Sequence, residues 1–260
     1  MDFVTSADGT RIAFETSGTG PPVVLLGGAC YGAKAWAAAA GFLAPQRTVY
    51  AVDRRGRGAS GPVDGYRTER EVEDVLALLQ RIGEPVELLG HSSGALLALR
   101  VALSGAPVTA MTLYEPPIRV PGGSGRDGVT ERLIELVAED DRDGAVATFI
   151  VDAVGDDPRL LDAMRRTPFW ATAMALAHTL PLDTRLRDES GLDGMAGLDV
   201  PVLLLLGERS DERMRTGVEA LAAALPNRVL EILPGQAHNA LREAPDLLAE
   251  RMLAAAHYSS

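Results

Sequence analysis

Short apolar runs alternate along the first half of the chain with longer segments in which apolar residues recur every three or four positions. Residues 11–15 alternate in polarity after a turn at 7–9, which predicts a β-hairpin. The continuous apolar runs at 23–26 and 48–52 are typical of strands that a parallel sheet buries on both faces. Residues 33–43, between these runs, are rich in alanine and favour a helix.

Residues 68–82 have a helical pattern, because their apolar positions gather on one face. We expect Thr68 and Glu71 to begin this helix as a capping box. The alternation then continues with three further elements, namely a strand at 86–89, a helix at 92–103 and a strand at 108–113. Such strand–helix–strand alternation predicts a right-handed, doubly wound, mostly parallel sheet.

The pattern changes after the segment Glu115-Pro116-Pro117. Residues 118–188 contain helical segments and no good strand. The earlier pattern then returns as a strand at 202–206, a helix at 212–225, a strand at 229–233 and a helix at 244–256. We therefore predict one α/β core, formed by residues 1–117 and 189–260, which a helical cap at 118–188 interrupts.

One segment carries a motif for nucleophilic catalysis. Gly90-His91-Ser92-Ser93-Gly94 matches the pattern G-x-S-x-G and lies between a predicted strand and a predicted helix. Small residues on both sides of Ser92 permit a sharp turn that raises its hydroxyl above the sheet. The start of the helix adds amide donors and a partial positive charge. A glycine turn with surface serines is the alternative, but this setting favours Ser92 as a nucleophile.

Three further segments give the chain a resemblance to the α/β-hydrolase superfamily over nearly its whole length. Leu25-Leu26-Gly27-Gly28-Ala29 stands where members usually have His-Gly-x, with Gly27 in place of the histidine. Residues 53–60 resemble the D-x-R-G-x-G-x-S loop, and 234–238 resemble the G-x-x-H loop that delivers the catalytic base. The resemblance implies an α/β-hydrolase fold, which is a doubly wound, mostly parallel, eight-stranded sheet with an inserted helical cap.

The resemblance also implies partners for the nucleophile. His238 follows the predicted strand 229–233, so it leaves the sheet at the edge where Ser92 also lies. A neutral imidazole there could take the Ser92 proton and return it to a leaving group. In this family two backbone N–H groups bind the oxyanion, which here implies those of Ser93 and Ala29.

The triad acid has two candidates. Many relatives place an aspartate three residues after a glycine that ends a late strand, but here that position is Ser210, followed by Asp211. Glu115 instead stands after the predicted strand 108–113, where some relatives, including haloalkane dehalogenases, carry their acid. The acid must accept the second N–H of the imidazole. The extra methylene of glutamate suits delivery from a neighbouring strand, so we predict Glu115, with Asp211 as the alternative.

The predicted cap roofs the cleft over Ser92 and would select the substrate. We expect substrate contacts at six positions, which are Gly28, Cys30, Tyr31, Trp170, Met174 and His178. The alternative for the apolar cap residues is that a stripe with helical spacing forms the cap's own core. We expect Arg54 to Arg57 to form structural salt bridges rather than to bind a carboxylate.

Composition narrows the function classes. With 25 Lys and Arg against 36 Asp and Glu, the net charge is −11, and no basic stripe offers contacts to nucleic acid. Cys30 is the single cysteine, which excludes an internal disulfide and a cysteine-built zinc site. No apolar run approaches the roughly 20 residues that cross a bilayer, and the first residues do not resemble a signal peptide. We expect a cytoplasmic monomer or homodimer with no metal, cofactor, membrane or nucleic-acid partner.

Together these patterns predict a cofactor-independent serine hydrolase that cleaves an ester or lactone of a hydrophobic small molecule through an acyl-enzyme. Ser92 at the turn excludes the usual epoxide hydrolase and dehalogenase chemistry, which needs a carboxylate there. Carbon–carbon bond hydrolysis and a biosynthetic cyclase or lyase remain open on the same scaffold. A non-catalytic ligand-binding receptor is less favoured, because a pure binder has no need of a Ser/His/acid set.

Overall fold

A computed structural model describes residues 1–63, 65–120 and 128–255 of the chain. Its eight strands form one sheet in the order β1-β2-β4-β3-β5-β6-β7-β8. The strands are β1 (Asp2–Thr5), β2 (Arg11–Gly18), β3 (Pro22–Leu26), β4 (Thr48–Val52), β5 (Val86–His91), β6 (Val108–Tyr114), β7 (Val202–Gly207) and β8 (Arg228–Leu233). β2 pairs antiparallel with β1 and β4, and the remaining pairs are parallel. The predicted mostly parallel, eight-stranded sheet is confirmed.

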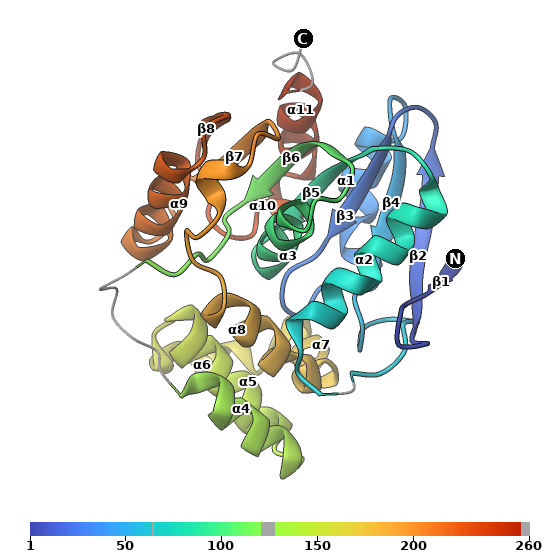
Figure 1. Ribbon diagram of the computed structural model, residues 1–260. Helices are drawn as coiled ribbons and strands as arrows, with labels where there is room; N and C mark the ends of the chain where they lie inside the picture. The colour runs from blue at the N-terminus through green and yellow to red at the C-terminus, as the bar shows by residue number, and fades with distance from the viewer. Residues whose placement is uncertain (64, 121–127, 256–260) are drawn as a thin grey trace.

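Helices cover both faces of this sheet (Figure 1). The helices α2 (Thr68–Ile82), α3 (Ser93–Leu103) and α9 (Glu212–Ala224) contribute to the core on one face. The helices α1 (Ala37–Leu43), α10 (Ala240–Glu243) and α11 (Pro245–Ala255) contribute to the core on the other face. Because side chains alternate along a strand, β3 feeds both cores and reads as a continuous apolar run.

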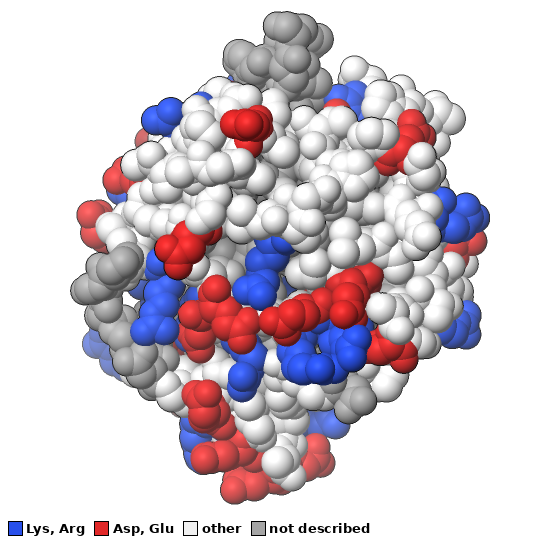
Figure 2. Space-filling view, in the orientation of Figure 1, with Lys and Arg blue, Asp and Glu red and all other residues white. Residues whose placement is uncertain are grey.

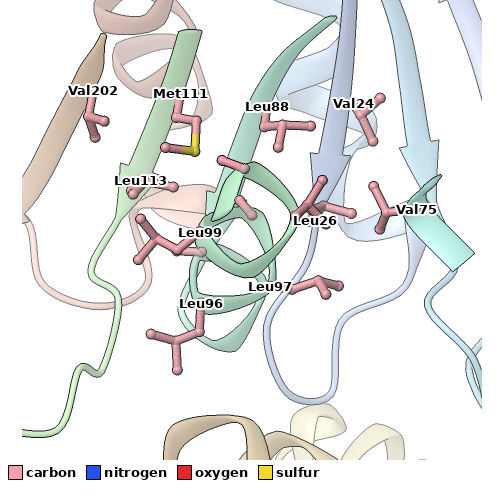
Figure 3. Close-up of a cluster of buried hydrophobic side chains, with 14 of the residues drawn as sticks. Val24, Leu26, Val75, Leu88, Leu96, Leu97, Leu99, Met111, Leu113 and Val202 are labelled. Carbon is pink, nitrogen blue, oxygen red and sulfur yellow. The ribbon is translucent and has the colours of Figure 1, made fainter. Parts of the chain in front are cut away.

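The larger core lies between the sheet and α3. Figure 3 shows Leu26, Leu88 and Met111, from three neighbouring strands, in one cluster with Leu96 and Leu99 of that helix. All five side chains are buried, and each stabilises the fold by about 1.5–3 kcal/mol. The close packing of α3 on the sheet fixes the position of its first turn, which follows directly on Ser92.

Between β6 and β7 the structure describes residues 115–120 and 128–201, and within them the helices of residues 128–188 are called here the cap helices. They are α4 (Val129–Ala138), α5 (Arg142–Thr148), a π-helical turn (Phe149–Val154), a 3-10 turn (Pro158–Leu160), α6 (Leu161–Met164), α7 (Pro168–Ala175), a 3-10 turn (Ala177–Thr179) and α8 (Leu180–Asp188). Figure 1 shows them together at one end of the sheet, where they enclose a hydrophobic cluster of their own. The predicted cap boundaries at 118 and 188 stay a prediction, and residues 121–127 lie outside the described ranges.

The predicted capping box at the start of α2 is wrong. Arg67 precedes the helix and makes no side-chain cap. The hydroxyl of Thr68 donates to Glu189 at 2.6 Å, and the Glu71 carboxylate pairs with Arg54 at 2.6 Å. Leaving the buried Arg54 guanidinium without a counter-charge would cost more free energy than leaving the helix end uncapped. Glu71 therefore pairs with Arg54 and does not cap the helix.

Charged side chains of both signs lie intermixed in a band across the face shown in Figure 2, at the level where the cap helices meet the sheet. Arg100, at the end of α3, lies 3.6 Å from the carboxylates of both Glu69 and Glu189. Within the described ranges, no helix is both long and apolar enough to cross a lipid bilayer. The same residues include no group of three or more His, Cys, Asp or Glu placed to hold a metal ion.

Candidate active site

Ser92 occupies the sharp turn between β5 and α3. Its backbone has φ 55° and ψ −125°, a conformation that costs a non-glycine residue energy. The glycines of the motif make room for this turn. A Cβ atom on Gly90 would collide with the backbone of Ala95 in α3, and one on Gly94 would collide with the carbonyl of Leu26. The G-x-S-x-G pattern therefore marks a strand–turn–helix junction, as predicted from the sequence.

Strained backbone gathers at this edge of the sheet. The described ranges contain four non-glycine residues with positive φ, and three of them lie at this edge. Ser92 follows β5, Glu115 (φ 49°) follows β6, and Cys30 (φ 62°) lies in the loop after β3. Such strain persists only where the surrounding packing holds it, and it concentrates at functional sites. The carboxyl edge of β3, β5 and β6 is therefore the first place to look for chemistry.

Glu115 reaches His238 across the sheet edge. The Glu115 side chain is completely buried, and its Oε2 lies 2.7 Å from Nδ1 of His238. Its other oxygen, Oε1, accepts a hydrogen bond from the backbone N–H of Gly207 at 2.7 Å and one from the hydroxyl of Ser210. Each carboxylate oxygen thus has a fixed partner, and the imidazole is held with Nδ1 toward the acid.

Asp211, the alternative acid, does not approach His238 in this way. Its carboxylate accepts the backbone N–H of Met214 at 2.7 Å as the N-cap of α9, and its side chain is 60% exposed. Ser210, which the sequence reasoning passed over, is the residue of this loop that contacts Glu115. A signal was available, because Ser210 stands at the position where many relatives carry aspartate.

Side chains of Tyr114 and His91 contact the backbone of the loop that carries His238. The Tyr114 hydroxyl donates to the carbonyl of Ala237, and Nε2 of His91 lies 3.0 Å from the carbonyl of His238. Burial, together with the neighbouring His238, holds the pKa of the His91 ring well below its ordinary value of 6.5. A carbonyl only accepts, so the neutral ring carries its proton on Nε2 and donates it to the loop. His91 thus supports the backbone of His238, a role that the sequence did not predict.

A cavity of about 280 Å³ opens at this edge and has Ser92, Glu115 and His238 in its lining. Ala29 and Ser93, the two predicted oxyanion donors, line it as well. Ser93 is the first residue of α3, so its N–H has no partner inside the helix and is free for a ligand.

A buried ionic network lies behind Ser93. The Ser93 hydroxyl donates to Asp183 of α8 at 2.6 Å and accepts from Arg54 at 3.0 Å. Arg54 and Arg57 both pair with Asp183, at 3.0 and 2.7 Å, and Arg54 also pairs with Glu71. Burial acts to raise the pKa of the Asp183 carboxyl, but Arg57 and Arg54 hold it below its ordinary value. As the sequence predicted, these arginines form structural ion pairs, and the pairs join the core to the cap helices.

The predicted substrate contacts from the cap stay predictions. None of Trp170, Met174 and His178 is among the described residues that line this cavity. Trp170 is buried in the cluster between the cap helices, where its Nε1 donates to Asp143 at 2.9 Å, and Met174 packs against the same cluster. The helical apolar stripe around Trp170 therefore packs between the cap helices and forms their core.

The predicted contacts from the loop after β3 also lie outside the cavity lining. Cys30 is buried in the cap cluster, and burial raises the pKa of its thiol to about 12. The centroids of the Tyr31 and His91 rings lie 5.5 Å apart. Gly28 passes behind the nucleophile so closely that a Cβ there would come 2.8 Å from the Ser92 Cβ. Gly28 and Tyr31 therefore pack against the elbow residues Ser92 and His91, whereas Cys30 packs with the cap helices.

The residues that do line the cavity were mostly missed. One part of the lining is apolar and includes Phe149, Ala153 and Val154 of the π-helical turn. Three arginines also line it, which are Arg187 on α8, Arg209 after β7 and Arg213 on α9. No local pattern marks these residues, since they come from separate elements that meet only in the folded chain.

A family model described as the alpha/beta hydrolase family matches residues 23–251. The chain belongs to this family. This hydrolase matches the crystal structure of an alpha/beta hydrolase from Sphaerobacter thermophilus with 38% identity and a TM-score of 0.90, over 98% of this chain and 99% of the other. It matches an esterase from Exiguobacterium antarcticum with 23% identity and a TM-score of 0.78 over 97% of each chain, a likeness that shows the fold alone.

Two relatives extend the comparison by sequence. A non-heme haloperoxidase from Rhodococcus erythropolis is 26% identical to this hydrolase over an alignment of 262 positions, which covers 92% of this chain and 93% of that protein. An N-formylmaleamate deformylase from Pseudomonas putida is 36% identical over 122 residues, covering 45% of this chain. That match spans 46% of the deformylase, less than half of its length. The predicted superfamily and α/β-hydrolase fold are confirmed, and the chain is an enzyme of the hydrolase class.

Proposed function

We propose that this hydrolase cleaves a carboxylic ester or lactone through an acyl-enzyme on Ser92. The observation that carries the proposal is the 2.7 Å contact between Glu115 and Nδ1 of His238, made at the cavity that Ser92 lines. A buried carboxylate that fixes one imidazole nitrogen leaves the other free to act as a base. The strained turn at Ser92 supports the same role, since it presents the hydroxyl at the edge of the sheet.

The reaction uses each group in turn. His238 takes the proton of Ser92 through Nε2 while the Ser92 oxygen attacks the substrate carbonyl, and Glu115 accepts the Nδ1–H and stabilises the imidazolium. The N–H groups of Ala29 and Ser93 bind the oxyanion. The oxyanion collapses as the carbon–oxygen bond to the alcohol breaks, and His238 returns the proton to that alcohol. A water molecule then repeats the sequence and releases the acid from Ser92.

Amide cleavage is the second candidate. The deformylase from Pseudomonas putida acts, by its name, on an N-formyl group, and its identity to this chain supports acyl transfer from nitrogen as well as from oxygen. The same groups would serve, because His238 can protonate a leaving nitrogen as it does an alcohol. Carbon–carbon hydrolysis and cyclase chemistry have no separate support and enter as outcomes of the test. A cytoplasmic location and the monomeric or dimeric state also stay predictions.

The test combines a covalent probe with turnover. Wild-type protein, Ser92→Ala and the control Ser104→Ala, at the far end of α3, are treated with a fluorophosphonate and assayed on 4-nitrophenyl acetate, on short lactones and on N-formyl amides. We expect labelling and ester or lactone turnover in the wild type and the control, with both lost in Ser92→Ala.

Each other outcome has a meaning. Labelling with turnover of the amides alone would favour the second candidate. Labelling with no turnover of any acyl substrate would favour a cyclase or carbon–carbon hydrolase. A folded protein that is neither labelled nor active would refute catalysis by Ser92.

A further inference from the structure

Cationic side chains gather beside the proposed nucleophile. Arg187, Arg209 and Arg213 line the same cavity as Ser92 and His238. Arg187 and Arg213 also line an adjoining cavity of about 410 Å³, which shares Pro117, Ala153 and Met214 with the first. These arginines share the lining with four carboxylates, those of Glu115, Asp156, Asp183 and Asp211.

The carboxylates in the same lining are already engaged. Glu115 is held by His238, Asp183 by the buried arginines of the core, and Asp211 by the first turn of α9. Asp156 also lines the cavity, and it is not free either. The carboxylates of Glu115, Asp183 and Asp211 are thus turned toward these partners, and the arginines have to be considered one by one.

Arg187 has donors left over. Its Nε and Nη2 both donate to one oxygen of Asp188, at 3.0 and 2.7 Å, which satisfies one edge of the guanidinium. Nη1 is buried and has no partner among the described residues, and the side chain as a whole is 15% exposed. An unpaired buried donor on a charged group is costly. Because Arg187 lines the cavity, a rotation of its guanidinium toward a ligand carboxylate would remove that cost.

Arg209 lines the cavity from the loop between β7 and α9. Its backbone N–H donates to the carbonyl of Gln236 at 2.8 Å, which ties its loop to the loop of His238. Its side chain is exposed, and the described residues give it no hydrogen bond or ion pair. Arg213 is less available, because it donates to the carbonyl of Val154 and lies 3.9 Å from Asp211.

We propose that the substrate carries a carboxylate, which Arg187 and Arg209 bind while the scissile carbonyl lies at Ser92. This inference rests on the proposed acyl-transfer function and names its substrate class. A guanidinium matches a carboxylate with two parallel hydrogen bonds, so the pair fixes orientation as well as charge. The cavity of about 280 Å³ is small for a ligand site, which limits the substrate to a short chain, and the apolar part of the lining packs on its methylene groups.

The test compares esters that differ only in charge. Mono-4-nitrophenyl glutarate carries a carboxylate on the acyl side, and its methyl-capped counterpart has none, while 4-acetoxybenzoate carries the charge on the leaving group. We expect the wild type to have a kcat/KM at least about 10-fold higher for one of the two charged esters than for its methyl-capped form. This advantage should shrink as salt is raised, because ions screen the attraction.

Variants assign the binding groups. Arg187→Gln and Arg209→Gln should each lower kcat/KM for the charged ester about 10- to 100-fold, mainly through KM, and leave the capped ester within about threefold. Arg228→Gln, at an exposed position on β8 away from the cavity lining, is the matched control and should change neither. Because Arg209 is exposed, its variant keeps the test valid even if Arg187→Gln unfolds.

The outcomes separate this inference from the proposed function. Equal kcat/KM for charged and capped esters, or equal losses on both in the variants, would overturn the carboxylate site and leave the hydrolase intact. If no ester is turned over but Ser92 is labelled, the readout becomes protection. Glutarate should then slow the labelling, its diamide should not, and equal effects would overturn the site. No labelling at all refutes the proposed function itself.

Discussion

Replacing Glu115 with glutamine is the sharpest perturbation of the site, because it removes the charge and keeps the shape. Oε1 of Glu115 accepts hydrogen bonds from the Gly207 N–H and the Ser210 hydroxyl. A backbone N–H only donates, so the carbonyl oxygen of the new amide must take that place. Its NH₂ group must then face Nδ1 of His238, where the carboxylate oxygen was at 2.7 Å.

This orientation changes which nitrogen of the His238 imidazole carries the proton. An NH₂ group donates, so Nδ1 of His238 must accept, and the ring proton moves to Nε2. His238 then cannot take the proton of Ser92. The same change from carboxylate to amide in a well-studied serine triad lowers kcat about 10⁴-fold. We expect a loss of about 10³- to 10⁴-fold, which corresponds to about 4–5.5 kcal/mol of activation free energy.

The assay measures kcat on an ester that the wild type turns over and, separately, the free energy of unfolding in urea. The amide keeps the hydrogen bonds from Gly207 and Ser210, so we expect the variant to stay folded. Asp211→Asn is the control, because asparagine caps a helix as well as aspartate does, and its kcat should stay within about threefold. A folded Glu115→Gln that keeps more than a tenth of the wild-type kcat would show that the reasoning is wrong.

Three further predictions concern stability and packing. Asp183→Asn should lower the free energy of unfolding in urea by about 3–5 kcal/mol, because it leaves Arg54 and Arg57 buried without a full counter-charge. Below pH 6.5 the unfolded chain protonates His91 while the folded, buried ring resists, so stability should fall by about 1.4 kcal/mol per pH unit from this group. His91→Asn should flatten that slope, and an unchanged slope would exclude His91 as its source. Trp170→Phe should lower the melting temperature and leave kcat/KM within about twofold, whereas a large loss of kcat/KM in the folded variant would return Trp170 to the substrate site.

The parts of the site that depend on local chain geometry were predictable. The G-x-S-x-G motif requires a strand–turn–helix junction wherever it acts as an elbow, and the structure has one at Ser92. The placement of Glu115 and His238 follows from topology, because parallel strands end at one edge of the sheet. The length of a glutamate side chain after β6 suggested that it could reach the histidine, and Glu115 does contact His238.

The lining of the cavity was not predictable, for a physical reason. An apolar helical stripe such as that around Trp170 has the same sequence pattern whether it faces a cleft or a neighbouring helix, and only the packing of the cap decides. Arg187 and Arg209 lie on separate elements and share no motif. The mistaken capping box at Glu71 has a similar origin, since its partner Arg54 is 17 residues away in sequence.

The ion pairs between Arg54, Arg57 and Asp183 make the two halves of this enzyme hard to exchange. Asp183 belongs to the cap helices, while both arginines and Ser93 belong to the core. A chimera that brought in a foreign cap without an acid at this position would strand two buried arginines and release the hydroxyl of Ser93 beside the nucleophile. Variation in α8 must therefore retain Asp183, so this helix and the residues beside Ser92 are constrained to evolve together.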